Sequence, residues 1–81
     1  MNEIEQRVLA VMSVVFDVKV DQIPANAAPG VLKQWDSLKH MNLVLALEDE
    51  FGFRFADDEL TDLLSLKLVL KIVSDKQDMK P

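Results

Sequence analysis

The first stretch of the chain, residues 2–17, has the apolar spacing of an amphipathic helix. Its apolar positions recur every three or four residues: Ile4, Val8, Val11 and Val15, with Leu9, Met12 and Phe16 alongside. Such spacing lines up side chains along one side of a helix. Asn2, followed three residues later by Glu5, is typical of a capping-box-like start. We therefore expect a helix from about Asn2 to Asp17.

Residues 18–34 show no helical or strand period. Pro24, Pro29 and Gly30 argue against any regular element there. The apolar positions within the stretch are Val20, Ile23 and Val31. A connection this long is unusual in a small domain and tends to be functional or wrapped over the core. We expect a packed crossover held by those three apolar side chains.

Residues 36–51 predict a second helix with two apolar rows. Asp36 is a good N-cap, and Gly52 provides a left-handed stop. The bulkier row should face the core and contains Leu43, Val44, Leu47 and Phe51. The opposite row contains Leu38, Met41 and Leu45, bordered by Asn42, Glu48 and Asp49. An exposed apolar row rimmed by acidic residues indicates a binding surface.

The last third of the chain predicts two more helices. Phe53 and Phe55 alternate around Arg54 in a short extended link, after which Asp57 caps a short third helix. Ser65 caps a fourth helix, whose apolar face is Leu66, Val69, Leu70 and Val73. The expected fold is an all-α four-helix bundle, with a long connection between the first two helices and a short third helix. We expect residues 1–81 to form a single domain.

Composition narrows the possible functions. The chain has 81 residues, 49% hydrophobic and 28% charged, which is ordinary for one globular domain. With no cysteine and one histidine, we expect neither disulfides nor a metal site. No apolar run approaches the length of a membrane span. Glu3 and Glu5 stand where a signal peptide would be basic, so we expect a cytoplasmic protein.

The negative charge is concentrated in one segment. The net charge is -5, yet residues 36–62 contain eight acidic and two basic residues, a net charge of -6. This segment would repel a phosphate backbone, so we expect no nucleic-acid partner. A protein with a basic patch would be attracted to it. The same concentration of acidic residues would also be found on a solvent-exposed face that only improves solubility, so this alternative stays open.

The sharpest local motif is Trp35-Asp36-Ser37-Leu38, where the long connection meets the second helix. Ser37 falls at the first helical position, beside free backbone N–H groups and the positive end of the helix dipole. A phosphate ester on its hydroxyl would be stabilised there. Asp-Ser is also a common way to start a helix, so the dipeptide alone does not establish a function.

Taken together, these features closely resemble the acyl carrier protein family over essentially the whole chain. The resemblance rests on Asp36-Ser37-Leu38 and on the apolar-acidic run from Leu43 to Phe51, which ends in Glu48-Asp49-Glu50-Phe51 and is followed by Gly52. It implies a non-catalytic carrier. In that family a separate magnesium-dependent phosphopantetheinyl transferase esterifies the serine matching Ser37 with phosphopantetheine from coenzyme A, helped by the aspartate matching Asp36. The thiol of this arm then carries acyl or aminoacyl groups between enzymes as thioesters.

The resemblance also assigns a partner-docking face. It comprises Leu38, Met41, Leu45, Glu48 and Asp49. The implied partners are the transferase, an acyl- or aminoacyl-loading ligase, and a downstream synthase or transferase with a basic docking patch. We expect the carrier to be a monomer.

Some positions depart from the pattern of fatty-acid-synthase carriers, which is more acidic where this chain has Lys39, His40 and Asn42. Trp35 before the motif and His40-Met41 after it look more like stand-alone specialised bacterial carriers of polyketide-like, surface-glycan or aminoacyl pathways. The Gly-Gly-x-Ser signature of peptidyl carrier domains is absent. The cargo and the pathway stay open.

Three other interpretations compete with a carrier. Asp36, Ser37 and His40 could form a hydrolytic triad, but Asp36 lies on the wrong side of the serine to orient the imidazole, and the motif is no nucleophile elbow. The chain could be an acidic helical interaction module without a prosthetic group, with Ser37 only a helix start. Calcium binding by the acids at 57–59 lacks the loop spacing and the central glycine.

Overall fold

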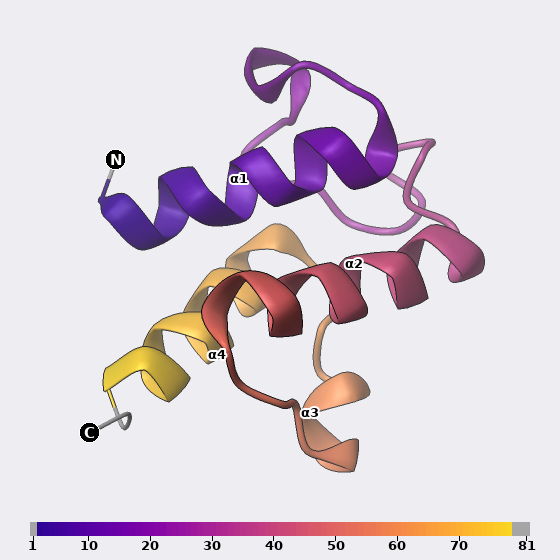
Figure 1. Cartoon of the computed structure of the whole chain (residues 1–81). Helices are drawn as coiled ribbons and strands as arrows, with labels where there is room; N and C mark the ends of the chain where they lie inside the picture. The colour runs from indigo at the N-terminus through magenta and orange to yellow at the C-terminus, as the bar shows by residue number, and fades with distance from the viewer. Residues whose placement is uncertain (1, 79–81) are drawn as a thin grey trace.

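The computed structural model describes residues 2–78, and its regular elements are all helical. They are α1 (Glu3–Phe16), the 3-10 helix η1 (Val20–Gln22), α2 (Ser37–Phe51), α3 (Asp57–Leu60) and α4 (Leu66–Asp78). Figure 1 shows α1 and α2 side by side and running in opposite directions, with α4 below α1 and passing behind the end of α2, and α3 at the bottom of the view. The expected all-α fold with four α-helices, a long first connection and a short third helix is confirmed.

The boundaries of α1 follow from its capping residues. The side chain of Asn2 accepts a hydrogen bond from the backbone N–H of Glu5 at 2.7 Å, so helical geometry starts at Glu3. At the other end Asp17 adopts a left-handed conformation, with φ 56°, and its N–H donates to the carbonyl of Ser13. The expected helix is therefore confirmed, with the two outermost residues serving as caps.

The crossover between α1 and α2 differs from the prediction. Residues 20–22 form the 3-10 turn η1, so the expectation of no regular element is wrong there. Of the three apolar residues expected to anchor the segment, Ile23 is buried, but Val20 and Val31 are 41% and 54% exposed. Consecutive tight turns, with no repeating period, decide which side chains point inward.

Three other crossover residues enter the core instead: Ala27, Leu32 and Trp35. Two backbone hydrogen bonds, from the N–H of Leu32 to the carbonyl of Ala28 and from the N–H of Trp35 to the carbonyl of Leu32, shape the turns that point these side chains inward. The carbonyl of Ala27 also accepts a hydrogen bond from the backbone N–H of Leu66 at 2.8 Å. The crossover is thereby joined to the beginning of α4.

The core lies where α1, α2 and α4 meet. From α2 it takes the predicted inward row, which is buried throughout: Leu43, Val44, Leu47 and Phe51. From the other two helices it takes Val8, Leu9, Met12, Phe16, Leu66, Val69 and Val73. Leu70, expected on the same face of α4, is only partly buried at its edge. Burying these apolar side chains is the main source of stability in a domain this small.

The start of α3 lies one residue from its predicted position. Ala56 is the N-cap, and Asp57 is the first helical residue. The shift arises because the carboxylate of Glu59 accepts a hydrogen bond from the backbone N–H of Ala56 at 2.7 Å. The prediction for α4 is confirmed, since Ser65 Oγ accepts from the N–H of Leu68.

Glu59 also joins α3 to α4. Its Oε1 lies 2.8 Å from Lys76 Nζ. The hydrogen bond from Ala56, then the one from Lys76, hold the pKa of Glu59 below its usual value. A carboxylate with a depressed pKa in the folded state adds stability above its ordinary pKa, and that stability disappears as the pH falls through the folded pKa.

We predict that Glu59→Gln lowers the free energy of unfolding by at most about 1 kcal/mol at neutral pH, as expected of a solvent-accessible ion pair. The difference from the wild type should shrink as the pH falls below about 4.5. Urea unfolding over a pH series measures it. Asp58→Asn removes the same charge from the same helix turn without touching Lys76 and is the matched control. A difference that stays constant down to acidic pH would contradict the assignment.

Candidate functional site

Ser37 lies at the start of α2 because Asp36 caps that helix. Asp36 has extended backbone geometry, and its Oδ1 accepts a hydrogen bond from the N–H of Lys39 at 2.8 Å. Helical geometry therefore begins at Ser37, whose side chain is exposed. The first-turn N–H groups and the positive end of the helix dipole lie beside its hydroxyl. The predicted position of Ser37 is confirmed.

An open depression of about 530 Å³ adjoins Ser37. It brings together the crossover, the first turn of α2 and the segment before α4. Its lining residues are Pro29, Trp35, Asp36, Ser37, His40, Met41 and Leu64. Apolar side chains dominate this lining. A group attached to Ser37 would thus leave the helix N-terminus next to an apolar surface.

A hydrogen bond between Trp35 and His40 forms part of this depression. The Trp35 indole is only 2% exposed and packs against the ring of Phe16, with 5.4 Å between ring centroids. Its Nε1–H donates to Nδ1 of His40 at 2.9 Å. Partial burial lowers the pKa of His40, which favours the neutral imidazole. In that neutral ring Nδ1 is the acceptor, so the proton resides on Nε2.

This bond argues against the hydrolytic triad. A general base must offer a free lone pair toward the serine hydroxyl. The lone pair of His40 is already used by Trp35, and the other ring nitrogen carries a proton. One oxygen of Asp36 is also engaged by the helix cap. Sequence reasoning missed the pair of Trp35 and His40, because a five-residue spacing across a helix start belongs to no regular period.

The predicted exposed row of α2 is exposed in the structure. Leu38, Met41 and Leu45 are 70%, 52% and 60% accessible, and Asp49 is exposed beside them. These four residues lie on the outer side of α2. The exposure on which the docking prediction depends is therefore present.

Two further observations refine this surface. Leu64, 61% exposed on the segment before α4, lies with Met41 along the depression beside Ser37, and sequence reasoning missed it. Its position after a short helix offered no periodic signal. Glu48 is only partly exposed, and its Oε2 accepts a hydrogen bond from the N–H of Phe55 at 2.9 Å. Glu48 therefore helps to hold the extended link as well as bordering the exposed row.

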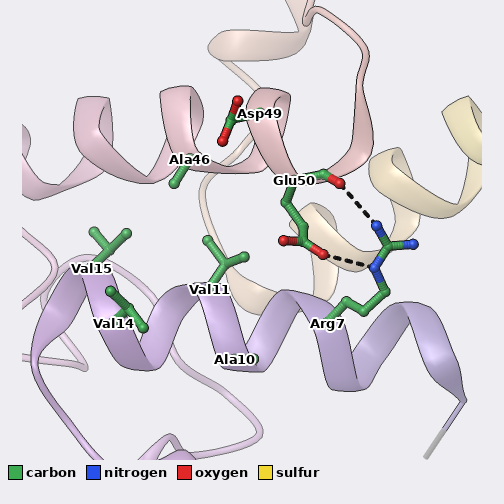
Figure 2. Close-up of a pocket in the computed structure, with 8 residues that line it drawn as sticks. All are labelled: Arg7, Ala10, Val11, Val14, Val15, Ala46, Asp49 and Glu50. Atoms are coloured by element: carbon green, nitrogen blue, oxygen red, sulfur yellow. Dashed lines mark hydrogen bonds and ion pairs between the residues drawn. The ribbon is translucent and has the colours of Figure 1, made fainter.

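A second depression, of about 380 Å³, lies between α1 and α2 (Figure 2). Its lining residues are Arg7, Ala10, Val11, Val14, Val15, Ala46, Asp49 and Glu50. It shares no lining residue with the depression beside Ser37. At one end Arg7 donates to the carboxylate and to the backbone carbonyl of Glu50, both at 2.9 Å. The guanidinium also lies 4.3 Å from the ring centroid of Phe51.

Within residues 2–78, no helix is long and apolar enough to span a bilayer. No group of three or more His, Cys, Asp or Glu side chains is arranged to hold a metal ion in that range.

Comparison with known proteins finds that the chain is similar to acyl carrier proteins. No family model matches it. It is 26% identical to the acyl carrier protein of Buchnera aphidicola subsp. Schizaphis graminum (strain Sg) over 76 residues, covering 94% of this chain and 96% of that protein. It is 29% identical to the acyl carrier protein of Thermosynechococcus vestitus (strain NIES-2133 / IAM M-273 / BP-1) over 75 residues, covering 93% of each. The matches over nearly its whole length and the all-helical fold support a relationship to the acyl carrier protein family.

Proposed function

We propose that this protein is a non-catalytic carrier that holds acyl or aminoacyl groups as thioesters on a phosphopantetheine arm attached to Ser37. The observation that supports this most is the position of Ser37. Its hydroxyl is exposed at the first residue of a long helix, directly after the capping aspartate and beside an open, largely apolar depression. The two relatives, both named acyl carrier protein, support the carrier role in general.

The residues around Ser37 suit the proposed group. Backbone N–H groups at the start of α2 and the helix dipole favour the negative charge of a phosphodiester. The arm would supply a terminal thiol, which the chain lacks because it has no cysteine. A tethered thioester also reaches a high effective concentration at each partner's active site.

The attachment step is an exchange at phosphorus. A bond would form between Ser37 Oγ and the pantetheine-bearing phosphorus of the coenzyme A diphosphate, the bond from that phosphorus to the bridging oxygen would break, and adenosine 3′,5′-bisphosphate would leave. The serine proton passes to a base of the separate phosphopantetheinyl transferase. We assign Asp36 a supporting role, since it adjoins Ser37 and its cap defines where α2 starts.

We further propose that the outer face of α2 docks the partner enzymes. The docking face consists of Leu38, Met41 and Leu45, with Glu48 and Asp49 at its rim. Its partners are the transferase, an acyl- or aminoacyl-loading ligase, and a downstream synthase or transferase with a basic patch. A small contact steered by charge allows rapid capture and release, which a shuttle requires. The carrier would work as a monomer in the cytoplasm.

We predict that incubation with coenzyme A, magnesium and a broad-specificity phosphopantetheinyl transferase adds one phosphopantetheine, measured by intact-protein mass spectrometry. Ser37→Ala should add none. Ser65→Ala is the matched control: it removes the other helix-starting serine, at a cost of about 1 kcal/mol of stability, and should still be modified. A folded wild-type protein that gains no mass would favour the acidic interaction module without a prosthetic group.

We predict that Asp49→Lys lowers kcat/KM for modification by the transferase about tenfold at low salt, because it reverses a charge at the docking rim. The effect should decrease with added salt. Asp75→Lys makes the same charge change on the exposed side of α4 and should have little effect. Equal losses in the two variants would show that total charge, and no local docking face, controls the rate.

A further inference from the structure

The ring of His40 has an N–H donor, at Nε2, for which no acceptor is described among residues 2–78. Its Nδ1 accepts the indole N–H of Trp35, so its proton is on Nε2. His40 follows Ser37 by three residues, close to one helical turn, and both line the same open depression. His40 therefore borders the depression in which a group on Ser37 would lie.

The other residues around this depression offer few competing acceptors. Pro29, Met41 and Leu64 contribute mainly apolar surface. Asp36 is the acidic residue of the lining, and its Oδ1 already accepts from Lys39. Asp36, the N-cap of α2, is thus the charged residue that lines the depression with His40, and Lys39 adjoins His40 in the sequence; the lining residues from the crossover and from the segment before α4 carry no charge.

From this arrangement we propose that His40, held by Trp35, donates its Nε2–H to a phosphodiester oxygen on Ser37 and so directs the first bonds of the arm. This inference rests on the proposed attachment of phosphopantetheine at Ser37. His40 acts here as a ligand of the phosphate, in addition to the backbone N–H groups of the helix start. Hydrogen bonds to an anionic oxygen are stronger than those between neutral groups.

Trp35 is a positioning residue in this scheme. Its ring is fixed in the core against Phe16, so the acceptor nitrogen of His40 is fixed with it. The tryptophan N–H selects one of the two neutral tautomers of the imidazole, and only that tautomer leaves Nε2–H as the donor. The site therefore extends from the hydrophobic core through His40 to the modified serine.

The test uses the modified protein and nuclear magnetic resonance. Protein loaded from coenzyme A is first checked by intact mass, and the phosphorus resonance of the arm and the His40 ring signals are then followed against pH. A phosphodiester keeps its single negative charge over the range in which histidine titrates. A phosphorus resonance that moves with pH in that range therefore reports on a neighbouring imidazole.

We expect the phosphorus resonance of the wild type to titrate with the His40 ring. The pKa of His40 should be higher in the modified protein than in the unmodified one, because the phosphodiester stabilises the imidazolium. His40→Ala should abolish the phosphorus titration and shift the resonance toward that of free phosphopantetheine. His40→Gln, whose amide retains a donor near the position of Nε2, should also abolish the titration but keep the resonance closer to the wild type. Trp35→Phe removes the indole N–H, and its resonance should lie between those of the wild type and His40→Ala.

The outcomes separate this inference from the proposed function. If the wild type gains no phosphopantetheine, both fail. If it is modified but its phosphorus resonance is independent of pH and unchanged in His40→Ala, only the role of His40 is overturned. Circular dichroism on each variant verifies the fold, and the glutamine variant keeps the test decisive if the alanine variant unfolds.

Discussion

The burial of Trp35 is the interaction on which the rest of the site depends. The chain reaches α2 through a crossover with no long helix or strand of its own, so its end must be anchored by side-chain packing. Trp35 provides that anchor by inserting against Phe16 at the end of α1 while its N–H meets His40 in the first turn of α2. Two elements that are distant in sequence thereby fix the direction in which α2 begins. Because Ser37 is the first residue of α2, this packing also fixes the position of Ser37.

The distribution of ion pairs sharpens the electrostatic character of α2. Arg7 on α1 pairs with Glu50, and Lys76 on α4 pairs with Glu59. Both basic residues come from outside the acidic segment. Arg7 also lies over the ring of Phe51 at the end of α2, and Lys76 over the rings of Phe53 and Phe55 in the link that follows. Arg7 binds a carboxylate near the end of α2, and Lys76 binds one on α3. Asp49 remains exposed beside the outer apolar row, so unpaired negative charge lies close to the surface that meets other proteins.

The burial of a residue could be predicted from the sequence where the residue was part of a regular helical spacing, and could not where it was not. The two rows of α2 were separated correctly, because Leu43 and Leu47 on one side and Leu38 and Leu45 on the other follow helical spacing. In the crossover that signal is absent, and Val31 was expected inside while Leu32 is the residue that is buried. A single turn decides which of two neighbouring apolar side chains points into the core, and their hydrophobicity alone does not show which one it is. The position of Ser37 was predictable from its cap, whereas the bond from Trp35 to His40 depends on tertiary packing that no local pattern encodes.

The hydrogen bond from Leu66 to Ala27 has a mechanical consequence for the depression beside Ser37. Pro29 lies two residues after its acceptor, and Leu64 lies two residues before its donor. Two segments that border the depression are therefore connected by one backbone hydrogen bond. Because of this link, widening the depression requires the crossover and the start of α4 to separate, which breaks the bond. The rate at which the Leu66 amide proton exchanges with solvent in the native protein consequently reports how often the crossover and the start of α4 separate.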